Sequence, residues 1–309
     1  MAKTDQVQNI KGYMLAFKLL MLIPQFPRII KNIKKAKGIN ENSNESIGKV
    51  IESKAIKHGN VVALRYEDQS FTYREFNQVI NRYANYLLSE GVNKGETVIA
   101  YLENRPELLF LIAACAKIGA IVSLVNPNQR EKTLIHSLEL TKSKFFFIGE
   151  ELLPFFENVH NSLTKTKEDN YYWISDRGIG NCPTHFKNVK KGLEKINSDN
   201  PAITQGITAN QVYANVFTSG TTGLPKASRQ TNRKWLATYY WFGKVNMNLN
   251  SDDVMYVPLP FYHTNALIVG WPTALAGSCT MVMRRKFSVS EFWQDVNKYN
   301  VSAFIYIGE

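Results

Sequence analysis

The stretch Tyr213–Lys226 reads YANVFTSGTTGLPK. Its first five residues, Tyr213–Phe217, are mostly apolar and predict a buried strand. The nine residues that follow, Thr218–Lys226, hold hydroxyl side chains, two glycines and one lysine. Glycines let a backbone approach a ligand closely, hydroxyls donate hydrogen bonds, and a lysine adds a mobile positive charge. This combination predicts a loop that binds a polyphosphate.

The spacing of this loop differs from that of the common phosphate-binding loop, G-x-x-x-x-G-K-[ST]. Pro225 precedes Lys226 and Ala227 follows it, so no hydroxyl stands directly after the lysine. Thr218–Lys226 resembles instead the phosphate-binding signature of the adenylate-forming (AMP-binding) enzymes, which include acyl-CoA synthetases, luciferases and peptide-synthetase adenylation domains. An ordinary turn rich in Gly, Ser and Thr stays open as the alternative.

The resemblance implies that the loop binds the β- and γ-phosphates of ATP, that Mg²⁺ bridges phosphate oxygens, and that CoA is the second substrate. Thr218 and Lys226 are the implied catalytic residues of the loop. The implied nucleotide-binding residues are Thr218, Ser219, Gly220, Thr221, Thr222, Gly223 and Lys226.

A second candidate site follows the predicted strand Val254–Val257 and reads LPFYHTN over Leu259–Asn265. It resembles the fourth motif of the same family, whose aromatic residues line the pocket shared by the adenylate and the acyl group. The resemblance implies that His263 belongs to the catalytic pocket, as a neutral imidazole that offers a hydrogen bond or a flat wall. A satisfied core histidine is the alternative. The spacing of His and Cys residues predicts no transition-metal site.

Strands alternate with helices along most of the chain, which predicts an α/β fold of layered, mixed, largely parallel sheets flanked by helices. The predicted strands are Val61–Tyr66, Thr97–Leu102, Ile121–Val125, Phe145–Ile148, Tyr171–Ile174, Tyr213–Phe217, Val254–Val257, Cys279–Met283 and Val301–Ile307. The predicted helices are one capped by Thr72 and Glu75, Pro106–Gly119, Glu131–Leu140, Gln230–Phe242, one that Phe261–Thr264 opens, and one capped by Ser288 and Glu291. Residues 176–210 are predicted to be irregular. Phe71–Phe76 and Ala114–Pro127 resemble two further family motifs, which we interpret as scaffold.

The composition is that of a globular protein with one large or two ordinary domains. Of the 309 residues, 44% are hydrophobic and 20% are charged. The three cysteines lie far apart and show no metal-binding spacing, which favours reduced thiols in the cytoplasm.

The formal net charge of +11 is concentrated in two basic runs, Arg28–Lys37 and Arg284–Lys286. Neither run alternates with aromatic residues as a single-strand binder requires, so we expect solvated basic faces and no nucleic-acid partner. One branch of this family shows a sequence similar to two segments here, Arg284–Asp295 and Tyr306–Glu309. That branch holds the fatty acid transport proteins and very-long-chain acyl-CoA synthetases. The second basic run is therefore also interpreted as a fold element beside the acyl site.

Residues 1–45 differ from the rest and are interpreted as a basic amphipathic leader and linker. The apolar run Met14–Ile23 is too short to span a bilayer, and Pro24 and Pro27 are expected to end any helix there. Residues 13–37 suit peripheral contact with an anionic membrane, and a helix packed on the protein itself is the alternative. We expect a cytoplasmic protein, with contact to the inner face of a membrane left open.

Residues 46–309 resemble the large N-terminal domain of adenylate-forming enzymes, incomplete at its C-terminus. The resemblance implies a ligase that joins a long-chain or very-long-chain fatty acid to CoA with ATP. In the order of the family's motifs, a Mg²⁺-binding glutamate and a C-terminal domain come later. We therefore expect this polypeptide to be inactive alone. A non-catalytic lipid-binding or membrane-docking protein and a ligase for another carboxylic acid stay open as alternatives.

Overall fold

The computed structural model describes residues 23–164, 170–178, 180–218 and 223–307, and its larger sheet carries the hairpin that holds the candidate loop. The strands of this sheet lie in the order β7-β6-β5-β3-β4-β8-β9. They are β3 Thr97–Tyr101, β4 Ile121–Leu124, β5 Phe145–Gly149, β6 Asn170–Ile174, β7 Lys187–Asn188, β8 Val212–Thr218 and β9 Lys226–Thr231. All neighbours are parallel except β8 and β9, so the carboxyl ends of β3, β4, β5, β6 and β8 lie along one edge.

The second sheet has the order β12-β10-β11-β1-β2. Its strands are β1 Val62–Tyr66, β2 Gln69–Thr72, β10 Val254–Val257, β11 Thr280–Met283 and β12 Ala303–Phe304. β12, β10, β11 and β1 are parallel to their neighbours, and β1 forms an antiparallel hairpin with β2. The predicted α/β class with mixed, largely parallel sheets is confirmed.

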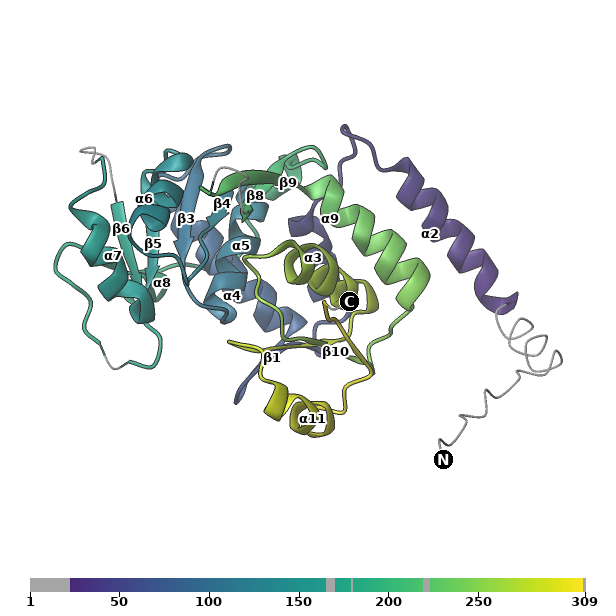
Figure 1. Ribbon diagram of the computed structural model, residues 1–309. Helices are drawn as coiled ribbons and strands as arrows, with labels where there is room; N and C mark the ends of the chain where they lie inside the picture. The colour runs from purple at the N-terminus through teal and green to yellow at the C-terminus, as the bar shows by residue number, and fades with distance from the viewer. Residues whose placement is uncertain (1–22, 165–169, 179, 219–222, 308–309) are drawn as a thin grey trace, which may run out of the picture.

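Helices cover the sheets and fill the space between them (Figure 1). The α-helices are α2 Phe26–Gly38, α3 Ile47–Lys57, α4 Tyr73–Ser89, α5 Pro106–Ile118, α6 Glu131–Leu140, α7 Leu153–His160, α8 Val189–Leu193, α9 Asn232–Thr238, α10 Trp271–Gly277 and α11 Val289–Lys298. Two π-helical segments, η4 Tyr239–Met247 and η5 Asn265–Gly270, prolong α9 and precede α10. Short 3₁₀ turns are η1 Ile23–Gln25, η2 Glu150–Leu152 and η3 Ala202–Gly206.

The two best-predicted helices begin and end where local chemistry dictates. Thr72 and Glu75 form both bonds of a capping box at the start of α4. α5 begins with Pro106 at its first turn and ends at Gly119, whose φ of 75° is left-handed. All of α5 except Glu107 is buried, because it packs against α3, α4 and the strands β3, β4 and β8.

A buried lysine joins the helices around α5. Lys117 Nζ donates to Glu52 Oε1 at 3.0 Å, Asn77 Oδ1 at 2.8 Å and Asn81 Oδ1 at 2.6 Å. Burial lowers the pKa of Lys117 to about 8, against the opposing effect of Glu52. We call Lys117, Glu52, Asn77 and Asn81 the Lys117 network. It joins α5 to α3 and α4.

Three sequence-based expectations about secondary structure are wrong, and one strand was not predicted. The segment after the candidate loop is strand β9, paired with β8, and the helix starts only at Asn232. This strand has polar residues and lies at the sheet edge, so it carries no apolar period to reveal it. Residues 176–210 are not all irregular, since they include β7, α8 and η3.

The other two errors lie near the end of the chain. The strand predicted at Val301–Ile307 is only Ala303–Phe304, because only these residues pair with β10. The side chain of Ser288 does not cap α11, since its Oγ bonds the Oγ of Ser290 at 3.0 Å.

The first basic run forms a helix, α2, that begins at Phe26 with Pro27 in its first turn. The helix that Pro24 and Pro27 were expected to end would lie over Met14–Ile23, of which residues 14–22 are outside the described ranges, so that expectation stays a prediction. Figure 1 shows α2 alongside the helix that continues from α9, and α2 packs against η4. The part of residues 13–37 that is described thus lies on the protein's own body. In the described part of the chain, no helix is long and apolar enough to cross a membrane.

Candidate functional site

The candidate phosphate loop connects two antiparallel strands at the carboxyl edge of the larger sheet. Thr218 ends β8 and Lys226 begins β9, and these two residues face each other across the strands. Thr218 Oγ1 donates to the carbonyl of Lys226 at 3.4 Å. Both residues are solvent-exposed, so both ends of the loop are open to a ligand.

Gly223 is the one glycine of the loop within the described residues, and its φ is 83°. A Cβ at Gly223 would meet nothing within 4 Å, so the left-handed backbone and not crowding favours glycine there. Ser219, Gly220, Thr221 and Thr222 lie outside the described residues.

A histidine that the sequence did not single out lies against the end of this loop. His136 Nε2, on α6, lies 2.9 Å from the carbonyl oxygen of Pro225. A carbonyl only accepts, so Nε2 carries the proton in this contact. The contact fixes the backbone one residue before Lys226. Since 89 residues separate the partners, no local pattern could have revealed it.

His263 lies in the segment between β10 and η5. It is solvent-accessible, and its ring centroid lies 4.5 Å from that of Tyr262. Its backbone N–H donates to the carbonyl of Pro260 at 3.1 Å. Partial burial lowers the pKa of His263 from its ordinary value, which favours a neutral imidazole at pH 7.

Asn104 joins the carboxyl ends of the two sheets and was not predicted. It follows β3 and is only 2% exposed. Its Nδ2 donates to the carbonyl of Arg284 at 2.6 Å and to that of Leu259 at 3.4 Å. Its Oδ1 accepts from the N–H of Phe261 at 2.9 Å. The segment that carries His263 is therefore attached to the sheet that carries the loop. The polar run Glu103-Asn104-Arg105 between a strand and Pro106 was the available signal.

Arg105, the next residue, bonds the carboxyl end of the larger sheet. Its guanidinium donates to the carbonyls of Ile174 and Ser175, both at 3.0 Å, at the end of β6. It also pairs with Glu107 at 2.9 Å and Glu151 at 3.3 Å. These carboxylates raise its pKa, against the effect of burial.

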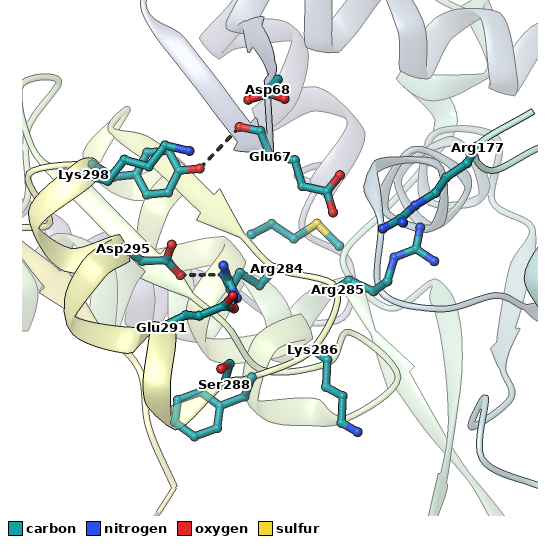
Figure 2. Close-up of a pocket in the computed structure, with 13 residues that line it drawn as sticks. Glu67, Asp68, Arg177, Arg284, Arg285, Lys286, Ser288, Glu291, Asp295 and Lys298 are labelled. Carbon is teal, nitrogen blue, oxygen red and sulfur yellow. Dashed lines mark hydrogen bonds and ion pairs between the residues drawn. The ribbon is translucent and has the colours of Figure 1, made fainter.

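The second basic run is not a free basic face, which corrects that expectation. Arg284 pairs with Glu291 and Asp295, and Arg285 pairs with Glu103 and Asp176. These arginines line a charged pocket of about 620 Å³ in which Figure 2 shows Arg177 and Arg285 on one side. The pairs of Arg284 attach α11 to the end of β11, and the pairs of Arg285 attach it to the segments after β3 and β6. This is the arrangement expected of a fold element.

An apolar cleft of about 640 Å³ begins in the segment just before His263. Its walls include large, solvent-exposed side chains, such as Trp293 at 67% and Tyr306 at 72% exposure. The lining residues are Pro258, Leu259, Phe287, Val289, Phe292, Trp293, Phe304, Ile305, Tyr306 and Ile307.

The structure brings Thr218, Gly223 and Lys226 together on one hairpin and leaves His263 on a segment of the other sheet. Within the described ranges, no hydrogen bond links His263 to the hairpin directly, and Asn104, which follows β3 of the hairpin's sheet, bonds the segment that carries His263. Searched over those same ranges, His, Cys, Asp and Glu side chains form no group of three that could hold a metal ion.

A comparison with known protein families identifies the family of this chain. The AMP-binding enzyme model matches residues 51–308. The chain belongs to the AMP-binding enzyme family. This match spans the Lys117 network, the loop, Asn104 and the His263 segment.

Two curated relatives illustrate the similarity of this AMP-binding chain. It is 32% identical over 295 residues to the medium/long-chain-fatty-acid–CoA ligase FadD6 of Mycobacterium tuberculosis (strain ATCC 25618 / H37Rv), which covers 96% of this chain and 47% of that protein. It is 30% identical over 253 residues to long-chain fatty acid transport protein 6 of Mus musculus, which covers 79% and 39%. The chain thus spans less than half the length of these relatives.

Solved structures show the same fold. The N-terminal domain of FACL13 from Mycobacterium tuberculosis matches with a TM-score of 0.72 at 19% identity, over 84% of this chain and 62% of that one. The anthranilate CoA ligase AuaEII, in complex with anthranoyl-AMP, matches with a TM-score of 0.77 at 17% identity, over 87% and 50%.

Proposed function

We propose that this chain is part of a ligase that joins a long-chain or very-long-chain fatty acid to CoA in two steps. In the first step the carboxylate attacks the α-phosphate of ATP, which forms acyl-AMP and releases pyrophosphate. In the second step the CoA thiolate attacks the acyl carbon and AMP leaves. The observation that carries the proposal is the β8–β9 hairpin, which presents Thr218 and Lys226 at the carboxyl edge of the sheet.

The chemistry requires positioning and charge neutralisation more than a reactive side chain. A carboxylate is a poor acyl donor because oxide is a poor leaving group, and adenylation replaces it with AMP. The Lys226 ammonium and the Thr218 hydroxyl are proposed to contact the β- and γ-phosphates, together with Ser219, Gly220, Thr221, Thr222 and Gly223 of the loop. Mg²⁺, when bound, would supply further charge neutralisation through phosphate oxygens.

His263 is proposed to form a wall of the pocket that holds the adenylate and the acyl carbonyl. Its lowered pKa suits a neutral ring, and Asn104 fixes the backbone of its segment. The apolar cleft next to this segment is proposed to accept the fatty acyl chain, since its walls are aromatic and aliphatic.

We propose that residues 46–309 form an incomplete adenylation domain and that residues 1–45 form a basic leader and linker. The chain is proposed to be incompetent alone, because it corresponds to 47% of the ligase relative FadD6.

A cytoplasmic location with peripheral contact to the inner face of a membrane, through residues 13–37, is part of the same proposal. Ile23, Phe26 and Ile30 are large apolar side chains that η1 and α2 expose beside basic residues.

A non-catalytic lipid-binding protein is the second candidate. The exposed apolar cleft favours it, because a cleft of this kind can hold an acyl chain without any nucleotide.

The deciding experiment measures fatty-acid-dependent pyrophosphate release from ATP. It uses a polypeptide that continues this reading frame to the length of the ligase relative, together with Lys226→Ala and the surface control Lys190→Ala. We expect release by the parent and the control and a loss of about tenfold or more for Lys226→Ala. Binding of fatty acid without any release of pyrophosphate would favour the lipid-binding candidate instead.

A further inference from the structure

A small basic pocket lies between α2, α3 and η4, on elements other than those that carry the hairpin. Its volume is about 280 Å³. Figure 1 shows two of these elements, α2 and the helix that continues from α9, running side by side. Five lysines line it, namely Lys35, Lys49, Lys54, Lys57 and Lys244. Glu45 is the single acidic side chain among the lining residues that the structure describes.

Lys54 is the buried member of this group, with 6% of its surface exposed. Its Nζ donates to Ser278 Oγ at 2.5 Å and to the carbonyl of Ala276 at 3.3 Å. Both acceptors are neutral, and within the described ranges no carboxylate lies within ion-pair distance of this ammonium. A buried ammonium without a counterion is costly, so Lys54 is stabilised either by losing its proton or by a bound anion that keeps it charged.

The one carboxylate of the pocket is already engaged. Glu45 Oε1 accepts from the hydroxyl of Tyr240 at 2.7 Å and lies 3.4 Å from Lys35 Nζ. Lys54, Lys57 and Lys244 therefore have no share in its charge by direct contact. Lys49 is held elsewhere, because its Nζ donates to the carbonyl of Ile207 at 3.1 Å.

The remaining cations act on one another. Burial, and then the positive charge of Lys244, lowers the pKa of Lys54 to about 7. Burial followed by the charges of Lys54 and Lys244 lowers the pKa of His58 as well. The titratable groups around Lys54 are Lys57 of α3, His58 at the C-cap of α3, Lys244 and Tyr239 of η4, and Cys279. Lys54, Lys57 and Lys244 therefore bring positive charges together, and the one lining carboxylate, Glu45, pairs with Lys35 instead.

We propose that this pocket binds a phosphate group, at a site separate from the β8–β9 hairpin. A phosphate carries up to two negative charges on oxygens that accept from several ammonium donors at once, as Lys54, Lys57 and Lys244 present them. The volume exceeds that of one phosphate, so the ligand can carry a small attached group beside the Tyr239 ring. Two sources share this chemistry: a small phosphate compound in solution and the phosphomonoester headgroup of a lipid.

Binding of orthophosphate to residues 1–309 tests the proposal, by calorimetric titration at constant ionic strength in the Lys226→Ala background. That background removes the lysine of the hairpin, so failure of the proposed ligase site does not affect the result. We expect saturable binding that Lys57→Gln/Lys244→Gln weakens about tenfold, while the matched surface pair Lys190→Gln/Lys191→Gln leaves it unchanged.

Lys54→Met is the sharper variant, but Lys54 is buried and its loss affects folding, so the double variant of less buried lysines keeps the test decisive. Phosphate affinity that is the same in parent and pocket variant, or absent from both, overturns the proposal.

Vesicles identify the source of the phosphate. Phosphatidylcholine vesicles that contain phosphatidic acid are compared with pure phosphatidylcholine vesicles, using the same proteins. Retention that needs phosphatidic acid and is lost in Lys57→Gln/Lys244→Gln assigns the pocket to a lipid headgroup. Orthophosphate binding without such retention assigns it to a soluble phosphate.

Discussion

The Lys117 network and the β8–β9 hairpin both centre on a lysine, yet their surroundings differ in every respect. Lys117 is fully buried and donates to a carboxylate and to amide oxygens from neighbouring helices. Lys226 is exposed, and its side chain makes no ion pair within the described residues. The difference indicates that the first lysine is needed to hold the fold and the second is available to a ligand. The variants below separate these two roles.

The largest effect is expected for Lys117→Met. It removes the cation and leaves Glu52 buried among amides that lose their partner. Breaking a buried pair in this way costs about 3–5 kcal/mol of the free energy of unfolding. Urea denaturation of the variant, next to the surface control Lys190→Met, measures it. A midpoint equal to that of the control would show that the network does not stabilise the fold.

Asn104→Ala is expected to cost less stability and to disturb the site more. It leaves the buried N–H of Phe261 without its partner, at about 1–3 kcal/mol, and it also removes the donor to the part-buried carbonyl of Arg284. The His263 segment should also loosen, which hydrogen exchange at residues 259–265 can detect. If exchange there is unchanged, Asn104 does not connect the two sheets functionally.

Lys226→Ala is expected to change the free energy of unfolding by less than about 0.5 kcal/mol, because an exposed side chain is removed. ATP affinity should nevertheless fall by about tenfold or more. Comparison of urea midpoints with ATP titrations gives both quantities. Strong destabilisation by Lys226→Ala would show that Lys226, like Lys117, is needed to hold the fold.

A further prediction concerns the pH dependence of stability at Lys54. Its pKa is about 7 in the folded chain and near 10.5 when it is unfolded. The unfolded chain therefore binds more protons between these values, so this group makes folding more favourable as pH rises through the window. Between pH 7 and pH 9, the free energy of unfolding of the parent should increase relative to that of Lys54→Met. If this difference does not change with pH, the pKa of Lys54 is not lowered in the folded chain.

The sequence predicted those elements whose causes lie within a few residues. The capping box of Thr72 and Glu75 and the Pro106 and Gly119 limits of α5 are local, and the structure confirms them. The alternation of strands with helices predicted the sheet class for the same reason.

The long-range contacts of the site could not be predicted. Asn104 and Arg284 are 180 positions apart, and His136 and Pro225 are 89 apart, so no spacing rule connects them. Strand β9 was missed because its partner, not its own composition, makes it a strand. The roles of the loop residues and of His263 stay predictions.

Backbone hydrogen exchange of residues 1–309, with and without Mg²⁺ and ATP, tests the central claim most directly. We expect ATP to protect amides of residues 218–226, and we expect this protection to be lost in Lys226→Ala and kept in Lys190→Ala. Exchange at residues 218–226 that ATP leaves unchanged, or protection that persists in Lys226→Ala, would contradict the claim that this hairpin binds the nucleotide.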